Sequence, residues 1–200
     1  MKGKITSYFI RLFGLNFQDI LWENQRLTIR KLLKRPNVII ESPDSLGVDI
    51  NIVIKENFAK LNIYRGTEFR NFCSIYLHEH ASLTINSNVF FNNYCSINCL
   101  GNIEIGTNTI FGENVKLYDH NHHHQFGENG QLEVKRLDFR IGSIKIGENC
   151  WIGSNVTILN NVEIGDNVII GANCLIYKSV PSNTIVKLKS EYVMEVNEKG

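Results

Sequence analysis

The stretch IGENCWIGSNVTILNNVEIGDNVIIGANCLIYKSVP, residues 146–181, carries an isoleucine at every sixth position. A small or branched residue stands four places after each isoleucine. The two series are Ile146, Ile152, Ile158, Ile164, Ile170 and Ile176, and Cys150, Val156, Val162, Val168, Cys174 and Val180. A period of six fits neither the 3.6-residue period of a helix nor the alternation of an ordinary strand. It predicts a β-helix whose coils stack on one another and bury ladders of isoleucine and valine.

The repeat extends toward the N-terminus with interruptions. Its earlier segments are INSNVF, FNNYCS, INCLGN, IGTNTI and FGENVK, which begin at residues 85, 91, 97, 105 and 111. From about Val38 to Leu83 the period is weaker, although FRNFCS at Phe69 fits it. We expect each first-position residue to point inward and each small residue to turn a corner, followed by Gly or Asn where the backbone needs a positive φ. Cysteines at the small position are expected to be buried apolar groups.

The pattern [Ile/Leu/Val]-Gly-x-x-[Val/Cys]-x resembles the left-handed parallel β-helix of the hexapeptide-repeat acyltransferases, over about residues 38–186. The same fold resembles that of some sugar nucleotidyltransferase domains and γ-class carbonic anhydrases. We therefore predict an all-β catalytic domain over 37–186 with a protruding loop over 118–143. Residues 1–36 are predicted to form a helical cap, with Asn16 as an N-cap and Pro36 ending the helix. Residues 187–200 are predicted to be a polar tail.

Charge is nearly balanced over the 200 residues but concentrated at one end. Residues 1–36 hold eight of the basic residues and only two acidic ones, Asp19 and Glu23. This segment is expected either to be a solvated cap or to meet an anionic surface, such as a membrane or polysaccharide-assembly machinery, and no nucleic-acid partner is expected. No apolar run reaches the roughly 20 residues that span a bilayer. Five cysteines without a framework spacing favour a reducing cytoplasm.

The repeat stops at YDHNHHHQ, residues 118–125, which holds four of the six histidines. Long interruptions of a regular scaffold are usually functional or disordered. Zinc is one hypothesis, with His120 and His122 as two ligands, but adjacent histidines converge poorly on one ion. A general base is the second hypothesis, because imidazole titrates near neutrality and can take a proton from an attacking hydroxyl. A solvated loop is the third.

FFNNYCSINCLGNIEIGTNTIFGENVKLYDHNH, followed by the second repeat block, resembles the galactoside and maltose acetyltransferases and the polysaccharide O-acetyltransferases. The resemblance implies His122 as catalytic base by ungapped alignment, with His120 of the Asp-His-Asn-His motif as competitor, and Asn92 as an acceptor contact. Asp119 and Arg140 are further substrate-binding candidates. The implied acetyl-CoA contacts are Trp151, Gly153, Ser154, Ala172 and Lys178, although Ser154 and Ala172 are equally well explained as turn residues. Leu100 stands where galactoside acetyltransferases have a carboxylate, so the acceptor is expected to differ.

The predicted reaction is direct transfer of acetyl from acetyl-CoA to a sugar hydroxyl, without a metal. The resemblance implies a homotrimer with active sites between subunits. A capsular, exo- or lipopolysaccharide glycan is the expected acceptor, since Lys135, Arg136 and Arg140 favour an anionic polymer. The alternatives are N-acetylation of an amino sugar or an antibiotic, a γ-class carbonic anhydrase, and a non-catalytic scaffold.

Overall fold

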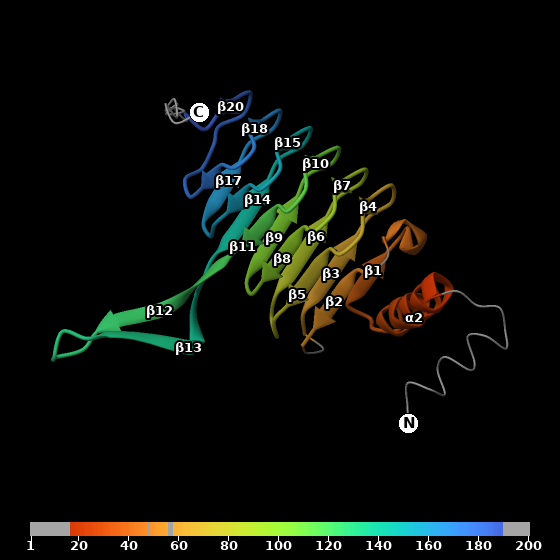
Figure 1. Cartoon of the computed structure of the whole chain (residues 1–200), viewed down its shortest axis with the longest axis horizontal. Helices are drawn as coiled ribbons and strands as arrows, with labels where there is room; N and C mark the ends of the chain where they lie inside the picture. The colour runs from red at the N-terminus through yellow and green to blue at the C-terminus, as the bar shows by residue number, and fades with distance from the viewer. Residues whose placement is uncertain (1–16, 48, 56–57, 190–200) are drawn as a thin grey trace, which may run out of the picture.

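The computed structural model describes residues 17–189 apart from 48 and 56–57. Three parallel six-stranded sheets form its stack of coils (Figure 1). Sheet A orders β1 (Val38–Ile40), β3 (Lys60–Ile63), β6 (Ser82–Ile85), β9 (Asn102–Ile105), β14 (Ser143–Ile146) and β17 (Val162–Ile164). Sheet B orders β4 (Glu68–Phe69), β7 (Phe90–Phe91), β10 (Ile110–Phe111), β15 (Trp151–Ile152), β18 (Ile169–Ile170) and β20 (Ile185–Val186). Sheet C orders β2 (Asn51–Ile54), β5 (Ser74–Leu77), β8 (Ser96–Cys99), β11 (Lys116–Tyr118), β16 (Thr157–Ile158) and β19 (Leu175–Ile176). The predicted parallel β-helix is confirmed.

Each coil passes through sheets A, B and C in turn, so the cross-section has three sides and three corners. We name these the A–B, B–C and C–A corners. Because a corner of a triangle faces the opposite side, the C–A corner points away from sheet B. Residues at the C–A corner and residues on sheet B of the same chain therefore lie far from each other across the stack.

The coils differ in length along the stack. Leu61 pairs with Leu83, 22 residues later, whereas Ile152 pairs with Ile170, 18 residues later. In the upstream coils the strands of sheets A and C are four residues long, apart from β1. The extra residues break the six-residue phase without breaking the ladder of inward side chains. They explain why the repeat is weak in the sequence between Val38 and Leu83.

The core is a set of ladders in which equivalent residues of successive coils stack. The six phased isoleucines from Ile146 to Ile176 are all buried, as predicted. On sheet B the ladder is aromatic, with the rings of Phe69, Phe91 and Phe111 stacked 4.3 and 4.5 Å apart between centroids. All five cysteines are free and buried, as small apolar groups would be. Each fully buried side chain of this size contributes about 1.5–3 kcal/mol.

The corners use left-handed asparagines one place before the small residue, rather than a residue that follows it. Asn149, Asn155, Asn161, Asn167 and Asn173 all have φ between 56° and 63°. Asparagine tolerates this conformation better than most residues. Its amide side chains also stack, as where Asn114 donates to Asn155 at 2.9 Å. The prediction of positive φ at the corners was correct, but it placed the residue on the wrong side of the small position.

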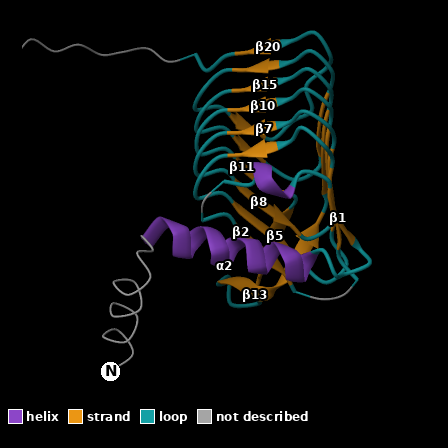
Figure 2. Cartoon of the chain, turned by 90° about the vertical axis from the view of Figure 1, so that its right-hand side faces the viewer, coloured by secondary structure: helices purple, strands orange, loops and turns teal. Residues whose placement is uncertain are grey.

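Helix α2 (Phe17–Leu32) lies across the N-terminal end of the stack (Figure 2). Ile29 and Leu32 are buried in the core cluster, and Gln25 Nε2 donates to the carbonyls of Leu46 and Gly47. A short 3-10 helix, η1 (Pro43–Ser45), follows β1. The helix ends four residues before Pro36, while the proposed N-cap Asn16 lies outside the described residues. None of the described helices is long and apolar enough to cross a bilayer.

The interruption after β11 is an antiparallel hairpin rather than an irregular loop. Its strands are β12 (His120–Phe126) and β13 (Leu132–Ile141), and it projects well away from the stack (Figure 1). It leaves at the C–A corner, because the chain passes from β11 of sheet C to β14 of sheet A. Alternation along β12 puts His120, His122, His124 and Phe126 on one face of the hairpin.

Candidate active site

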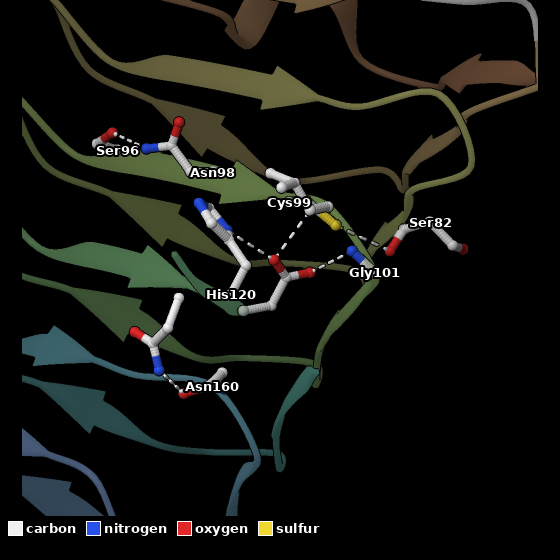
Figure 3. A network of polar contacts seen from close by, with 10 residues as sticks. Ser82, Ser96, Asn98, Cys99, Gly101, His120 and Asn160 are labelled. Atoms are coloured by element: carbon white, nitrogen blue, oxygen red, sulfur yellow. Dashed lines mark hydrogen bonds and ion pairs between the residues drawn. The ribbon is translucent and has the colours of Figure 1, made fainter. Parts of the chain in front are cut away.

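The base of the hairpin is fixed by the buried carboxylate of Asp119. Its Oδ1 accepts the N–H of Leu100 and its Oδ2 accepts the N–H of Gly101, both at 2.8 Å (Figure 3). The Asp119 carbonyl also accepts the N–H of Gly142 at 2.7 Å. One residue thus ties the start of the hairpin to the coil before it and to the residue where the hairpin returns. Asp119, predicted as a substrate-binding residue, is 0% exposed, and its carboxylate reaches the outside of the stack through His120.

His120 is the histidine that this carboxylate holds. Its Nδ1 lies 3.2 Å from Asp119 Oδ1, and 16% of its side chain is exposed (Figure 3). The ring meets Phe139 edge-on at 5.3 Å between centroids. In the neutral tautomer that donates from Nδ1 to this carboxylate, Nε2 keeps its lone pair. A histidine oriented in this way is suited to take a proton from a hydroxyl group.

The thiol of Cys99 lies beside the same carboxylate. Burial, and next the negative charge of Asp119, raise the pKa of this thiol well above its ordinary value. The thiol therefore stays protonated and donates to the Ser82 carbonyl at 3.4 Å. Cys99 is a packing residue beside the histidine rather than a nucleophile.

The other three histidines of the hairpin are held less firmly than His120. His122 is exposed, with Nδ1 3.3 Å from the Lys135 carbonyl and its ring 4.8 Å from that of Phe139. His124 Nδ1 lies 3.4 Å from the His122 carbonyl. His123 Nδ1 is buried and has no hydrogen-bond partner among the described residues. Of the four, His120 alone lies within hydrogen-bonding distance of a carboxylate in the described part of the chain.

Trp151 stands in an outward-facing apolar column on sheet B. The paired residues of this column, from the second strand of sheet B upward, are Phe90, Ile110, Trp151, Ile169 and Ile185. Trp151 is 56% exposed, which agrees with the outward position expected from the sequence. Strands that face water on one side normally carry polar residues there, so this column is an unusual surface for a protein to leave open.

The remaining donor candidates divide between two sides of the molecule. Gly153, Ser154 and Ala172 follow sheet B into the B–C corner, on the same side as Trp151. A Cβ on Gly153 would lie 2.6 Å from the Ala172 nitrogen, so these coils pack too closely there for a side chain. Ser154 Oγ accepts the N–H of Glu113 at 3.1 Å, which supports its interpretation as a turn residue. Lys178 lies at the C–A corner, exposed, with Nζ 5.6 Å from the Tyr177 ring centroid.

The acceptor candidates divide in the same way. Asn92 lies at the B–C corner, where its side-chain Oδ1 accepts the N–H of Asn93 at 2.9 Å. Arg140 lies on the hairpin, and its Nη2 donates to the His124 carbonyl at 3.4 Å. The structure therefore places Asn92, Trp151 and Ser154 on sheet B or at the B–C corner, whereas the histidines, Arg140 and Lys178 lie at the C–A corner or on the hairpin that leaves it. No single chain brings the two groups together.

Sequence reasoning missed the contribution of Phe139 and the hairpin register that places it. Phe139 pairs with His122 in the hairpin and contacts the rings of both His120 and His122. Within residues 17–189, apart from 48 and 56–57, no group of three or more His, Cys, Asp or Glu side chains is arranged to hold a metal ion.

Residues 143–178 match the bacterial transferase hexapeptide family, which is described by six repeats. A putative lipopolysaccharide biosynthesis O-acetyl transferase, WbbJ of Escherichia coli K12, is 30% identical over 103 residues, 50% of this chain and 53% of WbbJ. The chain spans about half the length of the curated relatives it matches. The match to this family covers residues 143–178, and the coils outside that range repeat the same three-sheet arrangement.

Two solved structures extend the likeness over most of the chain. The polysialic acid O-acetyltransferase OatWY is 26% identical, with a TM-score of 0.53 over 74% of this chain and 77% of its own. AntD, an N-acyltransferase from Bacillus cereus solved with coenzyme A, is 18% identical, with a TM-score of 0.57 over 85% of this chain and 90% of its own. At that identity AntD supports the fold alone.

Proposed function

We propose that this protein transfers an acetyl group from acetyl-CoA to a hydroxyl of a bacterial surface glycan. The observation that carries the proposal is the Asp119–His120 pair, which leaves one imidazole nitrogen free for a proton at the rim of the scaffold. The likeness to a putative lipopolysaccharide O-acetyl transferase and to a polysialic acid O-acetyltransferase supports the reaction class and the acceptor class.

In the proposed step, His120 Nε2 removes the proton of the sugar hydroxyl. The oxygen attacks the carbonyl carbon of the thioester, and the carbon–sulfur bond breaks. The coenzyme A thiolate leaves and takes the proton back from the imidazolium. Asp119 holds the ring and stabilises its charged form, as a buried carboxylate does beside other catalytic histidines. His122, which the alignment predicted as base, remains the competitor, since it shares the same hairpin face two residues further out.

The proposed site forms between copies of the chain. His120 lies at the C–A corner and Trp151 on sheet B, so the two meet only when the hairpin of one copy reaches sheet B of another. The hairpin face that carries His120 also carries Ile141, Val134 and Leu132, opposite His120, His124 and Phe126. These three are 56–57% exposed, and an isolated hairpin with such a face is only marginally stable in water. Burial against the apolar column of sheet B would cover both surfaces in a closed ring, for which we propose a trimer.

The proposal is tested by incubating the purified protein with acetyl-labelled acetyl-CoA and lipopolysaccharide, capsular polysaccharide or monosaccharides. The expected product is a labelled glycan whose label is released by hydroxylamine, which cleaves esters and leaves amides. His120→Gln should lose about 10²–10⁴-fold in kcat, the usual contribution of a general base. A label stable to hydroxylamine would mean N-acetylation. Failure to bind acetyl-CoA in calorimetry would contradict the proposal outright.

A further inference from the structure

Two bulky aromatic residues occupy left-handed backbone positions at the B–C corner. Each coil has one positive-φ residue two places before its sheet C strand, and the column formed by these residues reads Asp49, Phe72, Tyr94, Asn114, Asn155 and Asn173. Phe72 has φ 60° and Tyr94 has φ 63°. Asparagine and aspartate are suited to this region, whereas a bulky residue there is an outlier. The sequence marks the pair as a repeated tetrad, Asn-Phe-Cys-Ser at 71–74 and Asn-Tyr-Cys-Ser at 93–96.

The two rings form an exposed ridge. They stack 5.3 Å apart between centroids at an interplanar angle of 8°, and 51% of Phe72 and 56% of Tyr94 remain open. In the same column, Asn114, Asn155 and Asn173 form a chain of amide hydrogen bonds of 2.9 and 3.1 Å. Asparagine at 72 and 94 would relieve the backbone and could continue that chain. The aromatic pair is thus strained and exposed, whereas asparagine occupies the equivalent positions of other coils at lower cost. This combination points to function.

A shallow cleft adjoins the ridge on its sheet B side. Trp22 of α2 lines it together with Glu68, Arg70, Asn71 and Asn93. The Arg70 guanidinium lies 5.5 Å from the centroid of the Phe90 ring. Asn71 and Asn93 directly precede the two ridge aromatics in the chain, and the Asn71 N–H donates to Asn93 Oδ1 at 3.1 Å. Sugar rings offer apolar C–H faces and a rim of hydroxyls, and aromatic surface beside planar polar groups matches both.

We propose that the Phe72–Tyr94 ridge and this cleft bind the glycan chain of the acceptor, at sugars beyond the one that reacts. The identity of that glycan as acceptor rests on the proposed function, but the binding does not. Asn92, the predicted acceptor contact, lies two residues before Tyr94 in the same corner turn. The ridge extends from there toward the N-terminal end of the stack. A second copy of the chain is the less suitable occupant, because the cleft presents Glu68 and Arg70 where the centre of a subunit interface is depleted in charge.

The test replaces both aromatics with the residue that the column uses elsewhere, in the double variant Phe72→Asn/Tyr94→Asn. Binding of the full chain to two probes is measured by affinity electrophoresis, with O-antigen polysaccharide released from lipopolysaccharide in one gel and capsular polysaccharide in the other. Loss of two aromatic contacts should weaken polysaccharide binding at least about tenfold. Because the substitution removes strain, the melting temperature should stay the same or rise. Phe58→Asn, which removes an aromatic that is 69% exposed elsewhere, should leave binding unchanged.

Three outcomes overturn the inference. The wild-type chain binds neither polysaccharide, or the double variant binds as tightly as the wild type, or the double variant changes the oligomeric mass in sedimentation, which would make the ridge a subunit contact. Acetyl transfer separates this inference from the proposed function. With a monosaccharide acceptor the double variant should keep its kcat, whereas with the polymer its KM should rise about tenfold. Polysaccharide binding without any acetyl transfer would support the ridge and contradict the reaction.

Discussion

The carboxylate of Asp119 has two structural roles at once. It accepts two backbone N–H groups of the preceding coil, which fixes where the hairpin begins, and it orients the ring of His120. Both roles depend on the carboxylate accepting hydrogen bonds without donating any. The sequence shows this aspartate as one polar residue in a polar stretch, and its burial follows from the coil geometry at the C–A corner.

Asp119→Asn tests the orienting role. An amide can present its NH₂ group to Nδ1 and favour the other tautomer, so we expect kcat to fall about 10²–10⁴-fold, with little change in the KM for acetyl-CoA. The lost acceptor should also reduce the free energy of unfolding by about 1–3 kcal/mol, measured in urea. Asp138→Asn is the matched control, since Asp138 is an exposed carboxylate of the same hairpin that pairs with Lys135 at 3.7 Å. An unchanged kcat in Asp119→Asn would remove Asp119 from the mechanism.

The site could be predicted from the sequence only in part. The Asp-His-Asn-His motif and the interruption of the repeat pointed to the segment that carries the proposed base, and Trp151 was expected to face outward. The ungapped alignment predicts His122 as the base, whereas the hydrogen bond to Asp119 favours His120. The partner of a histidine is set by distance across the fold, and the sequence does not show that Asp119 is the buried member of the segment.

At the scale of elements, the six-residue period was sufficient to predict the coils after Ile146, and it failed where four-residue strands lengthen the coil. The hairpin was predicted only as a loop. Its β13 strand, LEVKRLDFRI, does not alternate regularly, and the pairing shifts between His122 and His124. The spacing of apolar residues therefore could not predict an antiparallel pair of strands inserted into a parallel stack.

The inward ladders should dominate the stability of the stack. Ile152→Ala removes a side chain that is 0% exposed and sits between Phe111 and Ile170, and we expect a loss of about 2–5 kcal/mol in the free energy of unfolding. Ile39→Ala, at an outward position of β1 that is 45% exposed, should cost less than about 1 kcal/mol. Urea denaturation of the two variants provides the comparison. Equal losses would mean that the ladder model of the core is wrong.

At the scale of the whole molecule, one half of the proposed site lies on sheet B and the other half lies at the C–A corner, which is opposite sheet B. Sheet B presents an apolar column, and the hairpin presents an apolar face together with the histidines. Each surface is costly to leave in water, and each matches the other in character. The proposed site therefore requires a second copy of the chain for activity as well as for burial of these surfaces.

Subunit complementation distinguishes a site shared between two chains from a site within one chain. His120→Gln and Trp151→Ala chains carrying different tags are co-expressed, and oligomers that retain both tags are isolated. Each variant alone should be nearly inactive in acetyl transfer, whereas mixed trimers that carry both tags should recover about a third of the wild-type rate, because one of their three sites pairs an intact histidine with an intact tryptophan. Mixed oligomers that are no more active than either parent would contradict a site shared between subunits.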